Sequence, residues 1–257
     1  MNDRTAVRTA IIAVAAFVVL GMPKAAFAVA WPTAADDLGK DISQLGLLVS
    51  LYVGGYLAGT LSMGRLDGRY GTGRLLTFAA ALAATAIAGY AAAGSWTVLA
   101  GAAIVLGLAG GWLDAGMNAH VAVHRGARVM GWIHAGFGIG SALGPLAMTG
   151  LLASGAGWRA GYWGMVVLQG AVFVSLLSTR DAWGSDRRRS RRVPVPNTPA
   201  VRLTLALFFL YVGLEVAAGQ WGYTLLTEGR GISGKTAGLA VNGFWVALTG
   251  MRILLGF

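Results

Sequence analysis

The sequence predicts an all-α, polytopic membrane protein with about eight transmembrane helices. Hydrophobic residues fill 56% of the 257 positions and charged residues only 12%, about half the charged fraction of soluble domains. The apolar residues gather in runs close to the roughly 20 residues that a membrane helix needs. This composition excludes a soluble enzyme, a disordered tail and a collagen-like fibre.

Eight apolar runs, separated by charged or glycine-rich joints, give the expected spans in order. They cover residues 9–31, 44–63, 75–94, 97–121, 129–153, 158–178, 201–226 and 236–257. A polar segment with six arginines, five of them at 187–192, and three prolines separates the sixth run from the seventh. The chain therefore divides into a six-helix bundle at 1–178, a basic linker at 179–200 and the first two helices of a second bundle at 201–257. We expect these last two helices to pack poorly.

The first span has an alternative interpretation as a signal peptide. Arg4 and Arg8 precede the apolar run, and Ala26-Phe27-Ala28 resembles a cleavage site. Pro23 and Lys24 interrupt the region before that site, and seven more spans follow. These features favour a membrane helix that is retained.

The distribution of Lys and Arg predicts the orientation. With the N-terminus in the cytoplasm, the inner segments hold fifteen of the twenty cations, the outer loops hold four, and Lys24 lies inside a span. We therefore expect a multi-pass protein of the cell membrane with a cytoplasmic N-terminus. The arginine run at 187–192 is then a cytoplasmic loop. No nucleic-acid partner is expected, because this loop offers no folded basic face.

The last two spans repeat features of the first two. Residues 238–244 resemble residues 46–52, 192 positions earlier. Lys24 and Glu215 differ by 191 positions, and Trp31 and Trp221 by 190. Transporters are often built from such duplicated bundles. Because two full copies would need a much longer chain, we expect a C-terminally truncated sequence.

The turn between spans two and three reads GRLDGRYGTGR at residues 64–74. It resembles the G-x-L-A-D-R-x-G-R signature of the major facilitator superfamily, with the acid one place earlier. The resemblance implies two six-helix bundles joined by a cytoplasmic loop, and transport by alternating access. It also implies a gating role for Gly64, Asp67, Arg69, Gly71 and Arg74.

Spans four and five resemble the fucose–proton symporter group of that superfamily. Asp114 stands four residues before Asn118, and span five contains Phe137 and Gly138. Ala135 occupies the place of the sugar-contacting Asn of that group. The resemblance implies proton coupling and a sugar as substrate.

Three charged residues lie well inside the spans: Lys24, Asp114 and Glu215. A charge at the centre of the bilayer costs at least about 2.5–3.5 kcal/mol, so each is a functional candidate. In the resembled fold, helices one, four and seven line the central cavity. All three charges would then lie along a polar translocation path.

Asp114 is the expected proton carrier. Asp114 and Asn118 are four residues apart and share one helix face. A carboxylic acid in a poorly hydrated cavity can take up and release a proton near neutral pH. The alternative is a capped, structural Asp near the inner end of the helix.

Lys24 and Glu215 should lie at the same depth, roughly 22 Å from the inner ends of their helices. They form a pair across the bundle interface, which would act as an outer gate, or they contact solute and water separately. The expected substrate and cavity residues are Lys24, Trp31, Trp112, Asn118, His134, Glu215, Trp221 and Asn242. His134 also suits a bond to a backbone carbonyl, and Trp31 and Trp221 suit the interfacial aromatic belt.

Two further patterns are weaker evidence for function. His120 and His124 have a spacing used by metal ligands, but no further acid or histidine joins them, so we expect no metal and no cofactor. Gly136, Gly140 and Gly144 form a face of small residues that lets helices approach closely. Residues 140–145 also resemble an antiporter signature.

The sequence therefore predicts a secondary active transporter, proton-coupled, for a small polar solute such as a sugar. An enzyme is not expected, because no paired catalytic constellation is evident. The expected partners are the lipid bilayer, a small-molecule substrate and protons. The alternatives are a proton-linked drug or metabolite exporter and a non-transporting truncated remnant.

Overall fold

The computed structural model describes residues 3–184 and 197–255, so the arginine run at 187–192 lies outside the described residues. Within them the chain is helical throughout. The elements are α1 (Asp3–Asp37), α2 (Gln44–Tyr70), α3 (Thr72–Ala91), α4 (Trp96–His124), α5 (Gly126–Ala153), α6 (Gly157–Ser178), the short 3-10 helix η1 (Arg180–Ala182), α7 (Pro199–Thr227) and α8 (Gly234–Leu255). The expected all-α polytopic architecture is confirmed.

Each predicted span corresponds to one long helix. In the described residues, all the long helices except α8 are both long and apolar enough to cross a membrane. The span predicted at 75–94 ends too late, because α3 stops at Ala91. The chain turns there, and the Ser95 hydroxyl accepts the Val98 N–H at 3.4 Å to cap the start of α4.

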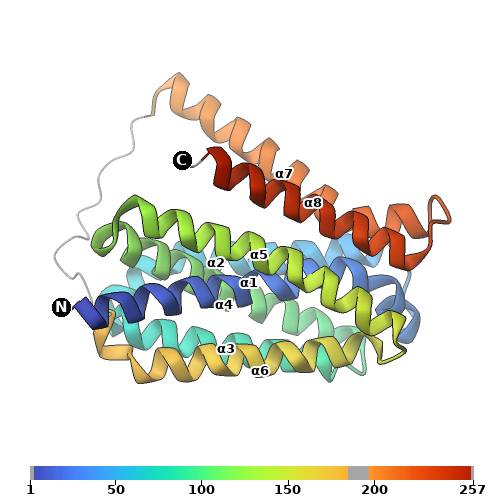
Figure 1. The fold of residues 1–257 in the computed structure, drawn as a ribbon, viewed down its shortest axis with the longest axis horizontal. Helices are drawn as coiled ribbons and strands as arrows, with labels where there is room; N and C mark the ends of the chain where they lie inside the picture. The colour runs from blue at the N-terminus through green and yellow to red at the C-terminus, as the bar shows by residue number, and fades with distance from the viewer. Residues whose placement is uncertain (1–2, 185–196, 256–257) are drawn as a thin grey trace.

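Helices α1 to α6 form a bundle, and α7 and α8 lie along one side of it, next to α5 (Figure 1). The closest packing joins the helices in pairs: α1 with α5, α2 with α4, and α3 with α6. In the third pair, the Gln169 side chain donates to the Ala80 carbonyl at 3.3 Å.

Glycine explains how α1 and α5 approach each other. A Cβ at Gly136, Gly140 or Gly144 would collide with a backbone carbonyl of α1 at residue 14, 18 or 22 respectively. The matching four-residue steps show that the two helices run parallel. The predicted small-residue face is confirmed, and its role in packing accounts for the glycines of the antiporter-like segment.

A second set of glycines joins α2 to α4 from both sides. Gly55 and Gly59 of α2 lie against the carbonyls of Ile104 and Leu108, and Gly107 and Gly111 of α4 lie against those of Tyr52 and Tyr56. Close approach of this kind strengthens dispersion contacts, which drive helix association where lipid removes the hydrophobic effect.

The two ends of the bundle differ in chemistry. At the end that holds the chain's N-terminus, Arg8 donates to the Ser178 hydroxyl at 3.1 Å and Arg125 donates to the Thr9 hydroxyl at 2.6 Å. At the opposite end, Arg159 pairs with Asp37, which also accepts the Trp158 indole N–H at 2.9 Å. The cations assigned to the inner side therefore gather at one end, as far as the described residues show.

Helices α7 and α8 make different contacts with the bundle. Every residue from 202 to 214 of α7 is exposed, and burial begins only in its second half. Helix α8 packs antiparallel on α5, where Gly138 faces Thr249 and Gly238 faces Thr149. Poor packing therefore describes the first half of α7 but is wrong for α8.

Candidate functional site

Asp114 lies at the centre of a polar cluster between α2 and α4. The Tyr56 hydroxyl donates to its Oδ2 at 2.7 Å, and Asn118 Nδ2 donates to its Oδ1 at 3.0 Å. Helix α4 continues for ten more residues to His124. The carboxylate is thus capped by two side chains well before the helix ends, and both interpretations, proton carrier and structural Asp, stay predictions.

Histidine from a third helix completes the cluster. His134 of α5 lies within electrostatic range of Asp114. The edge of its ring meets Phe17 of α1, with the ring centroids 6.0 Å apart. Side chains of α2 and α4 therefore bond to the carboxyl group, and His134 of α5 interacts with it electrostatically.

Lys24 lies at a second polar site, closer to the opposite end of α1. Its side chain is half-buried and interacts electrostatically with Glu215. Gln220 Nε2 donates to the Lys24 carbonyl at 3.2 Å. The two charges predicted to share one depth therefore interact electrostatically, and the Gln220 hydrogen bond joins α7 to α1 at this level.

A small cavity adjoins Lys24. Its lining combines one ammonium and one amide with aromatic and aliphatic side chains: Pro23, Lys24, Phe27, Leu48, Val49, Tyr52, Tyr90, Leu106 and Gln220. Ligand sites typically have this character, with a mostly apolar wall and few polar groups.

Two tyrosines of α2 connect the sites. Tyr52 lines the cavity, and its ring stacks on that of Tyr56 at a centroid distance of 6.2 Å. A Cβ at Gly110 would lie 3.6 Å from both the Tyr52 hydroxyl and the Tyr56 ring. The series Lys24, Tyr52, Tyr56 and Asp114 therefore crosses the bundle without a break.

Tyr52, Tyr56 and Gln220 were not predicted as site residues from the sequence. The signal that was available is the four-residue spacing of the tyrosines, which puts two hydroxyls on one face of an apolar span. Gln220 follows Glu215 by little more than one turn. None of the three carries a charge. The candidates were chosen because a charge inside a membrane span is costly, and that criterion does not select uncharged side chains.

Several predicted cavity residues lie elsewhere. Trp31 is fully buried and donates to the Ile42 carbonyl at 2.7 Å, and Trp112 donates to the Ser62 hydroxyl at 2.9 Å. Asn242 Nδ2 donates to the Ala142 carbonyl at 2.7 Å, joining α8 to α5. These three side chains hold helices together and do not face the Lys24 cavity. Trp221 lies near Gly46, where α2 begins.

The predicted gating residues gather around the turn between α2 and α3. Gly71 adopts φ 85°, which favours glycine, and its N–H bonds to the Asp67 carbonyl at 2.9 Å. The Thr72 hydroxyl bonds to Asp67 Oδ1 at 2.6 Å and contacts the Gly184 carbonyl at 3.2 Å. Arg69 lies over the Tyr70 ring, while Gly64 and Arg74 are exposed. Asp67 therefore anchors the segment that follows α6.

His120 and His124 stack on each other, with ring centroids 4.5 Å apart, and His120 also packs against Trp183. Both ring nitrogens of His120 are buried without a hydrogen-bond partner in the structure. Across the described ranges, no group of three or more histidine, cysteine or acidic residues is placed to hold a metal ion.

Comparison with known families finds a match to the Major Facilitator Superfamily over residues 12–257. The match includes α7 and α8 as well as nearly all of the six-helix bundle. Comparison with curated proteins finds no match.

Proposed function

The chain belongs to the major facilitator superfamily of secondary membrane transporters, and we propose that it couples protons to the movement of a small polar solute, such as a sugar. Asp114 carries the coupling proton, and the solute binds beside Lys24. One observation carries this proposal: a carboxyl group within the helical bundle is held by hydrogen bonds from Tyr56 and Asn118.

Proton uptake by Asp114 changes the hydrogen bonds that its neighbours can form with it. In the ionised form both carboxylate oxygens accept hydrogen bonds, whereas the protonated acid carries one donor. The Tyr56 hydroxyl can accept as well as donate. Asn118 Oδ1 is buried and has no hydrogen-bond partner in the structure, so rotation of this amide would offer an acceptor to the protonated acid. Each protonation state therefore favours its own arrangement of the cluster.

The cavity beside Lys24 has a volume of about 20 Å³, room for a water molecule, so a polyhydroxylated solute would enter only when the helices around it separate. Lys24 and Gln220 offer groups that bond to hydroxyls, and Phe27, Tyr52 and Tyr90 offer aromatic surfaces for the apolar face of a sugar ring. The stacked tyrosines join this cavity to Asp114. A solute that moves Tyr52 would thereby alter the hydroxyl that holds the carboxylate.

The proposal also includes the orientation of the chain in the membrane. The basic end of the bundle faces the cytoplasm, which agrees with the positive-inside rule. The Lys24 cavity then lies toward the outer side of Asp114, and the Lys24–Glu215 pair acts as an outer gate.

The test uses the purified chain in proteoliposomes, an imposed pH gradient and radiolabelled neutral monosaccharides including fucose. We expect proton-driven accumulation of at least one sugar. Asp114→Asn keeps the shape of the side chain but cannot ionise, so it should abolish accumulation and leave counterflow measurable. The matched control is Asp36→Asn, which removes an exposed carboxylate at the far end of α1.

Two outcomes would contradict the proposal. If no sugar accumulates under either direction of the gradient, the solute class is wrong. If Asp114→Asn accumulates sugar with an unchanged pH profile, another group carries the proton.

A further inference from the structure

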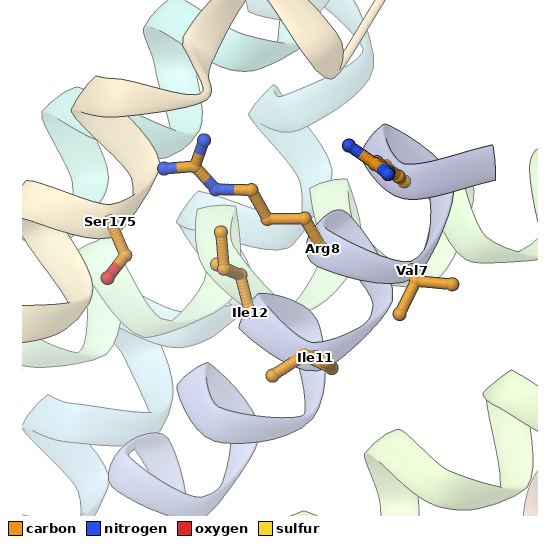
Figure 2. Close-up of a pocket in the computed structure, with 6 residues that line it drawn as sticks. Val7, Arg8, Ile11, Ile12 and Ser175 are labelled. Carbon is orange, nitrogen blue, oxygen red and sulfur yellow. The ribbon is translucent and has the colours of Figure 1, made fainter. Parts of the chain in front are cut away.

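A groove separates the start of α1 from the end of α6 at the basic end of the bundle. It has a volume of about 530 Å³ and is lined by Arg4, Val7, Arg8, Ile11, Ile12 and Ser175. In Figure 2 the Arg8 side chain extends from α1 toward the helix that holds Ser175, above Ile12. The transport proposal does not use this groove.

The upper part of the groove is cationic. Arg4 and Arg8 are four residues apart, so they share one face of α1. Arg8 donates one N–H to the Ser178 hydroxyl at 3.1 Å, which fixes the guanidinium beside α6. A guanidinium carries five N–H donors, so others remain to bind an anion. Among the described residues that line the groove, none is acidic.

The lower part of the groove is apolar and exposed. Val7 is 59% exposed and Ile11 is 63% exposed. Ile12 also lines the groove, one helical turn after Arg8. Helix α1 is long and apolar enough to cross a membrane, and exposed apolar side chains in its first turns suit contact with acyl chains. The groove thus places two cations directly above a hydrocarbon surface.

We propose that this groove binds the phosphate headgroup of an anionic phospholipid, with one acyl chain along Val7 and Ile11. Guanidinium groups match phosphate oxygens in charge and geometry, and basic pockets between membrane helices suit lipid headgroups. A free phosphate ion shares the headgroup chemistry but would leave the two apolar residues uncovered. The bound lipid joins the first turns of α1 to the end of α6.

Native mass spectrometry of the purified chain measures the affinity for phosphatidylglycerol, with phosphatidylcholine as the reference. We expect preferential binding of phosphatidylglycerol to the wild type. The double variant Arg4→Gln/Arg8→Gln should weaken it about thirtyfold, since each basic side chain near the surface contributes about a factor of five. Arg4→Lys/Arg8→Lys keeps the charge and should lose much less.

The matched control is Arg128→Gln/Arg202→Gln, which removes two exposed cations that do not line the groove. It should leave the affinity within about twofold of the wild type. Equal losses in both double variants would overturn the proposal, because binding would then follow net charge alone. If the glutamine variant does not fold, Ile11→Ser replaces it and should weaken binding of the lipid but not of inorganic phosphate.

Inorganic phosphate distinguishes the two sources of the headgroup. At equal ionic strength, millimolar phosphate should displace little more lipid than chloride does. Displacement by phosphate alone would show that the groove binds the free ion, and it would overturn the lipid assignment. This experiment measures binding without a pH gradient or sugar, so its failure and that of the transport proposal are distinguishable.

Discussion

Contacts within the six-helix bundle differ in kind from those that hold α7 and α8. Glycines of α5 lie against the backbone carbonyls of α1, and glycines of α2 and α4 lie against each other's carbonyls. On α8 and α7 the glycines meet side chains instead: Gly238 faces Thr149, and Gly219 faces Trp245. Backbone cannot move aside, whereas a side chain can rotate. The bundle is therefore the less adaptable of the two regions.

Burial shows the same difference between helices that the sequence makes equivalent. Of residues 11–23 of α1 only Ile11 and Ala15 are exposed, whereas the equivalent residues 202–214 of α7 are all exposed. Both helices are apolar enough to span a membrane. Helix α1 has neighbours on most sides, and α7 has α1 and α8. Burial thus depends on the number of neighbours and not on hydropathy.

Cleavage of the linker should separate the regions most clearly. We expect trypsin, in mild detergent, to cut at the arginines of 187–192 and leave the α1–α6 fragment folded and monodisperse, while the α7–α8 fragment elutes separately. Size-exclusion chromatography of the digest measures this. If the two fragments stay together and unfold in one transition, the regions form a single unit.

Alanine at Gly140 tests the backbone contact between α1 and α5. Its Cβ would collide with the Val18 carbonyl, so we expect a loss of about 3 kcal/mol in the free energy of unfolding. Gly138→Ala on the same helix meets only the Thr249 side chain and should cost about 1 kcal/mol. SDS-induced unfolding measures both.

The control for this pair is Gly150→Ala, where a Cβ would have nothing within 4 Å. Because alanine favours helix over glycine by about 1 kcal/mol, this substitution should not destabilise. Equal losses at Gly140 and Gly138 would mean that the distinction between backbone and side-chain contacts is wrong.

Lys24 of the bundle interacts electrostatically with Glu215 of α7, and a double-mutant cycle measures their coupling. Lys24→Gln and Glu215→Gln should each cost about 2 kcal/mol in thermal or SDS unfolding, because each leaves a charge in the bundle. The double variant should cost about 1 kcal/mol less than the sum. Strictly additive losses would show that the two residues act separately.

Within the bundle, Arg159→Gln should lower the free energy of unfolding by less than the Lys24 and Glu215 substitutions do. Arg159 pairs with Asp37, donates to the Ala93 carbonyl at 2.8 Å and lies over the Trp158 ring at 4.4 Å. Since the ion pair is largely exposed, we expect a loss of about 1 kcal/mol. That loss should shrink in high salt, because salt screens exposed charges. A loss that salt leaves unchanged would assign the effect to packing on Trp158.

The smallest expected effect is a pH dependence at Asp41, in the turn before α2. The hydroxyl and the backbone N–H of Ser43 bond to this carboxylate and hold the pKa of Asp41 below its usual value of 3.8. Its contribution to stability is therefore present above that value and is lost as the pH falls. Asp41→Asn should flatten the acid limb of the thermal midpoint slightly. An unchanged limb would assign it to other carboxylates.

Much of the fold follows from hydropathy, but the partners of each helix do not. The apolar runs predicted every long helix, and the spacing of Gly136, Gly140 and Gly144 predicted close packing. The cost of burying charge identified Lys24, Asp114 and Glu215, which the structure places in two connected sites. The hydrogen bonds of Trp31 and Trp112 were not predicted, because residue type does not reveal which way a side chain faces. Tyr56 was missed because a hydroxyl in an apolar span costs little.

The paired helices limit how the bundle can rearrange. Because α2 and α4 interlock through glycines on both sides, they are able to move only as one stiff body, and the same holds for α1 with α5. Asp114 sits at the seam between these two bodies: Tyr56 travels with it, whereas His134 belongs to the other body. Any motion that wets the carboxyl group must open this seam. His134 would then move away from the carboxylate, whereas Tyr56 and Asn118 lie on the same body as Asp114 and would stay hydrogen-bonded to it.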